Sequence, residues 1–167
     1  MKRTFFIEQS MNFTSFLELI KNGDVASLEV AISKWPELVN QPDPRGFPPL
    51  VIATYTNNVE MTKLLIQHGA RIDAKDAAGN TALMGVSFKG FYEMAKSLIH
   101  NGADVNAKNH RGDTPLSFAI TYDQYDIAKM LIHAGADKGV VDANGNSLLM
   151  IAESKKNREM IELLTSN

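Results

Sequence analysis

The 167-residue sequence contains no cysteine, and only 8% of its residues are aromatic. Without cysteine the chain forms no disulfide, has no thiolate nucleophile and offers no sulfur ligand to zinc. The formal net charge of −2 excludes a chain-wide positive field of the kind that holds nucleic acid or an anionic membrane. We therefore expect no metal, no cofactor and no nucleic-acid partner.

Long apolar runs are also missing. The apolar start Phe5-Phe6-Ile7 resembles the beginning of a signal peptide, but Glu8 and Gln9 interrupt it at once. No stretch approaches the ~18 apolar residues of a membrane span. Because 44% of the residues are hydrophobic, the chain can still bury a sizeable core. We expect a soluble, cytoplasmic protein without a membrane segment.

What the sequence does have is a repeat with a period of 33 residues. Four glycines stand at this spacing, namely Gly46, Gly79, Gly112 and Gly145. The same step relates the leucines Leu50, Leu83, Leu116 and Leu149, and the Gly-Ala pairs at 69–70, 102–103 and 135–136. A fixed period of this size predicts a solenoid, in which each unit packs on its neighbours.

Each unit has the pattern of two short helices. Thr114 and Pro115 form a helix start, with a hydroxyl cap followed by proline at the first helical position. Apolar residues at helical spacing follow, a break falls at 122–124, and a second apolar face precedes Gly135. Glycine after a helix predicts a left-handed terminal residue, and we expect the same conformation at Gly102. The pattern predicts a helix pair in every unit.

The segment 102–116, GADVNAKNHRGDTPL, resembles the ankyrin repeat, whose pattern runs G-A-D-V-N-A-x-D-x-x-G-x-T-P-L-H-x-A. The resemblance implies an all-α ankyrin-repeat solenoid, with helix pairs linked by β-hairpin-like loops and a capping repeat at each end. By alignment, an N-terminal arm covers 1–12 and a single domain covers 13–167. That domain divides into a cap at 13–42, repeats at 43–75, 76–108 and 109–141, and a C-terminal cap repeat at 142–167.

The sequence departs from the family pattern at two kinds of position. The histidine expected after T-P-L is replaced by Val51, Met84, Ser117 and Met150. We therefore expect its hydrogen-bond network to be absent. Pro48 stands where threonine is usual, so that helix should lack a hydroxyl cap.

The resemblance also implies where a partner would bind. In this family, hairpin tips and the ends of the first helices line a concave face whose residues vary with the partner. The positions carried over by alignment are Arg45, Phe47, Tyr55, Asn80, Phe88, Lys89, His110, Arg111, Asp113, Tyr122, Asn144 and Asn146. Among them Phe47, Tyr55, Phe88 and Tyr122 form an aromatic ladder, and aromatics and arginine dominate binding hot spots. The alternative is that Tyr55 and Phe88 simply pack against the neighbouring repeat.

The sequence gives little indication of a metal site or a catalytic site. His100 and His133 occupy equivalent positions about 8–10 Å apart, too far for one zinc ion, and we interpret them as surface residues at helix ends. Asp43, Asp76 and Asp142 recur at repeat spacing and are predicted turn formers. No acid–base or metal constellation can be assembled, so we expect no enzymatic activity.

Two hypotheses for function remain. In the first, the chain is a monomeric protein-interaction module, an adaptor or an inhibitor, that binds a protein partner through its concave face. In the second, it is a structural or regulatory subunit of a larger assembly, held by its convex face or by the N-terminal arm. Arg45, Arg111, Lys75, Lys89 and Lys108 add positive charge beside the aromatic ladder and favour a partner with acidic and apolar groups, although a solvated charged face explains the lysines better.

Overall fold

The computed structural model describes residues 12–166, and the arm predicted at 1–12, including Phe5-Phe6-Ile7, lies outside this range except for Asn12. Within it the chain forms α-helices, a 3₁₀ helix and no β-strand. The first helices of the pairs are α1 (Phe13–Asn22), α3 (Pro49–Tyr55), α5 (Ala82–Lys89), α7 (Pro115–Thr121) and α9 (Leu148–Ser154). The second helices are α2 (Val25–Lys34), α4 (Val59–Gln67), α6 (Tyr92–His100), α8 (Tyr125–His133) and α10 (Arg158–Thr165), and η2 (Pro36–Asn40) follows α2.

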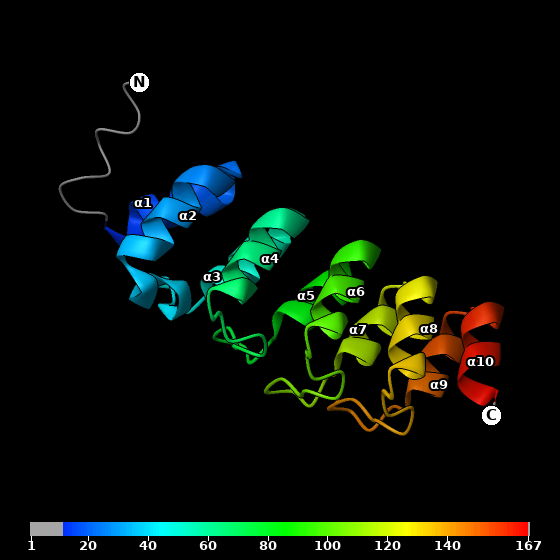
Figure 1. Cartoon of the computed structure of the whole chain (residues 1–167). Coiled ribbons are helices and arrows are strands. Elements are labelled where there is room, and N and C mark those ends of the chain that lie inside the picture. Colours follow the sequence, from blue (N-terminus) through cyan, green and yellow to red (C-terminus); the bar gives the residue numbers. More distant parts are fainter. Residues whose placement is uncertain (1–11, 167) are drawn as a thin grey trace.

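The helix pairs stand in one row from the N-terminal to the C-terminal end, with long loops projecting along one edge (Figure 1). Each first helix packs on the first helices of the adjacent pairs, as α5 does on α3 and α7. Each second helix packs in the same way on its neighbours in the outer layer. The prediction of an all-α repeat solenoid is confirmed.

The turn between the two helices of each pair contains one residue in the left-handed conformation. These residues are Gly23, Asn57, Gly90, Asp123 and Lys156, with φ between 53° and 77°. The break expected at 122–124 lies at this turn. Gly102 and Gly135, at the ends of the second helices, have φ of 88° and 92°, so their predicted left-handed conformation is confirmed.

The N-termini of the first helices are capped by hydroxyl groups where the sequence provides them. The Oγ1 of Thr114 accepts from the N–H of Ser117 at 3.2 Å, and the Ser117 Oγ accepts from the N–H of Thr114 at 3.1 Å. Pro48 makes no side-chain cap, as predicted. Ser117, which stands in place of the family's histidine, uses its hydroxyl to close the Thr114 cap reciprocally.

The loops are hairpin-like because an aspartate or asparagine at their base binds the backbone. Asp43 accepts the N–H groups of Arg45 and Phe47, and its own N–H donates to the carbonyl of Phe47 at 2.9 Å. The same bonds recur at Asp76, Asn109 and Asp142. The turn-forming role predicted for the aspartates is therefore confirmed.

The core is a double row of leucines that runs the length of the solenoid. Leu50, Leu83 and Leu116 of the first helices are at most 2% exposed, and Leu65 and Leu98 of the second helices are fully buried. Side-chain hydrogen bonds also join successive loops. Asn106, for example, accepts from the N–H of Asp137 at 2.8 Å and donates to the carbonyl of Gly135 at 3.1 Å. Each repeat is thus positioned by its neighbours.

Candidate functional site

The first helices and the hairpin loops share one face of the solenoid, which we call the inner face. The hairpin tips on this face carry two arginines, each held by an aspartate of its own turn. The Nε of Arg45 lies 3.3 Å from Asp43, and its guanidinium lies 5.2 Å from the centre of the Phe47 ring. The Nη2 of Arg111 lies 2.7 Å from Asp113. Both arginine side chains are more than two-thirds exposed, so their charges remain accessible.

Several predicted polar residues are engaged within the loops. The Asn80 amide donates to Asp76 at 3.2 Å and accepts from the Nδ2 of Asn109 at 2.9 Å, which ties two hairpins together. The Asn146 amide donates to Asp142 in the same manner at 2.9 Å. These amides support the loops, whereas Asn144 is exposed at a loop tip.

Adjacent hairpins also touch directly at their tips. The backbone N–H of His110 donates to the carbonyl of Ala78 at 3.1 Å, and its imidazole lies over Gly79. His110 is nevertheless exposed to solvent. The hairpins at 76–80 and 109–113 are therefore joined at their tips.

Three of the four residues of the predicted aromatic ladder come together in one groove. The Phe88 and Tyr122 rings meet edge to face with their centres 4.4 Å apart, and Tyr55 forms the opposite side. The groove has a volume of about 170 Å³ and is lined by Tyr55, Asn80, Met84, Gly85, Phe88, Phe118 and Tyr122. Tyr55 and Tyr122 are each 46% exposed. The inner face thus carries large apolar groups that the fold leaves uncovered.

Phe47 does not belong to this groove. It packs partly buried against the core, with Arg45 over its ring. Phe118 takes part instead, and its ring lies parallel to that of Tyr122 at 6.4 Å. Phe118 was not among the predicted residues because it falls outside the variable positions of the family pattern. Its spacing of four residues from Tyr122, which places both on one side of a helix, was the available signal.

The tyrosine hydroxyl beside the groove stays protonated at neutral pH. Burial raises the pKa of Tyr55, and the nearby carboxylate of Asp76 raises it further. The hydroxyl can therefore both donate and accept a hydrogen bond. It is a polar group at the edge of an otherwise apolar surface, and such groups fix the orientation of a bound molecule.

Lysines lie at the end of α5 and on the loops on either side of this helix. The Nζ of Lys89 lies 5.2 Å from the centre of the Phe88 ring, and the Nζ of Lys75 donates to the carbonyl of Lys108 at 2.9 Å. No ion pair within residues 12–166 involves these three lysines. Their positive charges are therefore not neutralised by a carboxylate of the described chain.

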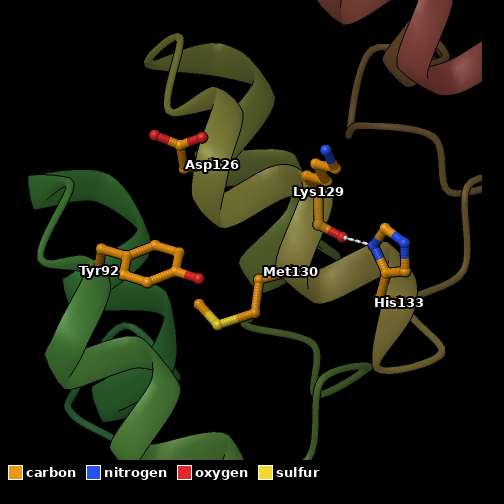
Figure 2. Close-up of a pocket in the computed structure, with 5 residues that line it drawn as sticks. All are labelled: Tyr92, Asp126, Lys129, Met130 and His133. Atoms are coloured by element: carbon orange, nitrogen blue, oxygen red, sulfur yellow. Dashed lines mark hydrogen bonds between the residues drawn. The ribbon is translucent and has the colours of Figure 1, made fainter.

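The opposite, outer face is formed by the second helices and carries two hollows related by the repeat. Tyr92, Asp126, Lys129, Met130 and His133 line one hollow of about 430 Å³ between α6 and α8. Figure 2 shows Tyr92 of α6 pointing toward Met130 of α8, and the His133 ring bound to the Lys129 carbonyl, with 2.6 Å between Nδ1 and O. The other hollow, of about 300 Å³, lies between α4 and α6.

His100 and His133 lie at the surface near helix ends, as predicted. His100 and His133 are the last residues of α6 and α8 and are exposed. In residues 12–166 no group of three or more histidine, aspartate and glutamate side chains is arranged to hold a metal ion. None of the helices in this part of the chain has the length and apolar character needed to cross a membrane.

The comparisons with known proteins include the following two matches. A family model described as ankyrin repeats (3 copies) matches residues 16–109 and 89–167. A segment of 58 residues, 35% of this chain, is 38% identical to the phosphocholine transferase AnkX of Legionella pneumophila. The matched segment spans only 6% of the length of AnkX.

Proposed function

Because this chain belongs to the ankyrin-repeat family, and ankyrin repeats generally mediate protein–protein interactions, we propose that it binds a protein partner through its inner face. The observation that carries the proposal is the aromatic groove of Tyr55, Phe88, Phe118 and Tyr122. Exposed aromatic rings gathered in a groove are typical of binding hot spots, because covering them removes apolar surface from water.

The surroundings of the groove support the same proposal. Asn80 of the groove and the arginines at the hairpin tips are held by turn hydrogen bonds or ion pairs, so a partner would meet ordered side chains. Ordering side chains on binding weakens affinity, and surfaces that are ordered in advance avoid this loss. We propose that the predicted residues on the loops, His110, Arg111 and Asn144 among them, form the polar border of this surface.

We propose further that the chain works as a monomer in the cytoplasm, with the repeat boundaries expected from the alignment, and that it catalyses no reaction. Ankyrin repeats are typically not enzymatic. The phosphocholine transferase activity named for AnkX belongs to that protein, of which this chain matches a small part. The groove is lined by aromatic, asparagine, methionine and glycine residues, and no carboxylate, histidine or lysine is among the lining residues.

The second candidate function, a subunit held by its outer face, has support from the hollow between α6 and α8. Tyr92 is 41% exposed there, and Met130 lies beside it (Figure 2). Exposed aromatic and methionine side chains are also common contact residues in protein–protein interfaces. The two candidates therefore differ in which face is covered in the complex.

One experiment separates them. We would immobilise the full chain, its Phe88→Ala/Tyr122→Ala variant and its Tyr92→Ala/Met130→Ala variant, and compare the proteins each retains from native lysate. We expect partner affinity to fall about 30-fold or more in the first variant, because two hot-spot aromatics are removed, and to stay near wild type in the second.

Circular dichroism melts would verify that both variants keep the fold. The reverse pattern, with capture lost only in the Tyr92→Ala/Met130→Ala variant, would transfer the proposal to the outer face. Capture that neither variant alters would contradict both candidates.

A further inference from the structure

The groove on the inner face owes its depth to Gly85, which lies within α5. The residues at the equivalent position of α3, α7 and α9 are Ile52, Phe118 and Ile151, all large and apolar. Glycine is unfavourable inside a helix. Gly85 has no positive φ, unlike the turn glycines, so the backbone does not require glycine here. The missing side chain instead leaves space beside Tyr55.

The space beside Gly85 contains no side chain of that residue and is bounded by aromatic rings at its sides. A Cβ atom added to Gly85 would lie 3.7 Å from the Tyr55 hydroxyl oxygen, which is ordinary contact. Beyond it the walls are formed by Tyr55 on one side and by Phe88 and Tyr122 on the other. The volume of about 170 Å³ is similar to that of an apolar cavity that accommodates a benzene ring, roughly 150 Å³. The hollow therefore fits one large apolar side chain.

The charges around the hollow define what should flank that side chain. Lys89 stands over Phe88, and Lys75 and Lys108 lie on the adjoining loops. Asp113 is paired with Arg111, whereas Asp76, whose carboxylate lies near Tyr55, accepts N–H groups of its own loop and takes part in no ion pair within residues 12–166. The three lysine charges outnumber the single carboxylate of Asp76, so the balance of charge beside the groove is positive and favours carboxylates in a partner.

Resting on the proposed function of the inner face, we propose that the hollow above Gly85 receives one phenylalanine- or leucine-sized side chain from an extended, acidic segment of the partner. The apolar anchor fills the groove among Tyr55, Phe88 and Tyr122. Its neighbouring carboxylates lie against the lysines. This arrangement resembles other peptide sites in which a pocket selects one side chain and surrounding charge selects the sequence.

The test uses the full chain and short fluorescent peptides of defined composition. The probes have a central phenylalanine between glutamates, a central alanine between glutamates, or a central phenylalanine between lysines. Binding is followed by fluorescence anisotropy. We expect the first peptide to bind about 10-fold or more tighter than the alanine peptide, since a buried aromatic anchor is lost in the latter. The lysine-flanked peptide should bind weakest because its charges oppose those of the groove.

Three variants locate the site. Gly85→Ile places at this position the residue found at 52 and 151, fills the hollow, and should weaken binding about 10-fold or more. Gly85→Ala, the matched comparison, leaves most of the space open and should weaken binding much less than Gly85→Ile. Lys89→Glu should weaken binding of the glutamate-flanked peptide and reduce its dependence on salt.

Equal binding by wild type and a folded Gly85→Ile variant would overturn the proposal, as would equal binding of the phenylalanine and alanine peptides or the absence of binding by all peptides. Sedimentation that reveals a dimer abolished by Gly85→Ile would overturn it too, by assigning the groove to a second copy of the chain. If natural-partner capture falls in Phe88→Ala/Tyr122→Ala but not in Gly85→Ile, the inner face still functions and only the hollow is refuted.

Discussion

Replacing three glycines by alanine, one at a time, should change stability in opposite directions according to the place of each glycine in the fold. Gly85 lies inside α5 without a positive φ, and an added Cβ would make ordinary contact with Tyr55. Gly102 has a φ of 88° and has no atom within 4 Å of an added Cβ. Gly79 has a φ of 81°, and its Cβ would lie 2.9 Å from the backbone nitrogen of His110. The substitution is the same, but its surroundings differ.

The expected magnitudes follow from these geometries. Gly85→Ala should raise the free energy of unfolding by about 0.5–1 kcal/mol, because alanine loses less backbone entropy in a helix. Gly102→Ala should lower it by about 1–2 kcal/mol through left-handed strain alone. Gly79→Ala adds to that strain an overlap with neighbouring backbone that cannot rotate away, worth about 1–3 kcal/mol more. The order of stability should therefore be Gly85→Ala, wild type, Gly102→Ala, Gly79→Ala.

Urea unfolding followed by circular dichroism at several wavelengths would measure the series, with coincident transitions checking two-state behaviour. In a chain of this size, each kcal/mol should shift the thermal midpoint by about 2–4 °C. Equal losses in Gly79→Ala and Gly102→Ala would refute the close approach of the two hairpins. An unchanged midpoint in Gly102→Ala would refute the left-handed backbone there.

Three further predictions concern the turns and caps. Lys156→Gly should stabilise the fold by about 1 kcal/mol in urea unfolding, because Lys156 has a left-handed φ of 55°; an unchanged or lower value would count against this. Hydrogen bonding to Lys155 holds the pKa of Asp123 below 3.8, so this pair stabilises the fold above about pH 4 and the gain is lost as the pH falls through the lowered pKa. Asp123→Asn should thus reduce stability at neutral pH by less than about 1 kcal/mol, as expected for an exposed pair, and the difference from wild type should vanish in titrations toward pH 2. Thr114→Ala should lower stability by about 1–2 kcal/mol in thermal melts, because the buried cap that it shares with Ser117 is lost, whereas a wild-type midpoint would show that the cap contributes little.

The candidate site was predictable in part. Tyr55, Phe88 and Tyr122 could be selected from the sequence because they stand at repeat-equivalent or neighbouring variable positions. Phe47 stands at the hairpin position that Asn80 occupies in the next repeat, not at the helix end shared by Tyr55 and Phe88, and its ring packs against the core. The contribution of Phe118 also depends on how α7 packs against α5, which its spacing from Tyr122 alone does not determine.

The period, the helix pairs and the turns were determined by the sequence alone. Each depends on short-range chemistry, such as the hydroxyl of Thr114 before a proline or the carboxylate of Asp76 at the base of its loop, and this chemistry repeats in nearly identical surroundings. Which side chains meet on the inner face was decided only by the tertiary structure. The hollow at Gly85 and the link between Asn80 and Asn109 join residues 29 or more positions apart, and their contact depends on the stacking of whole repeats.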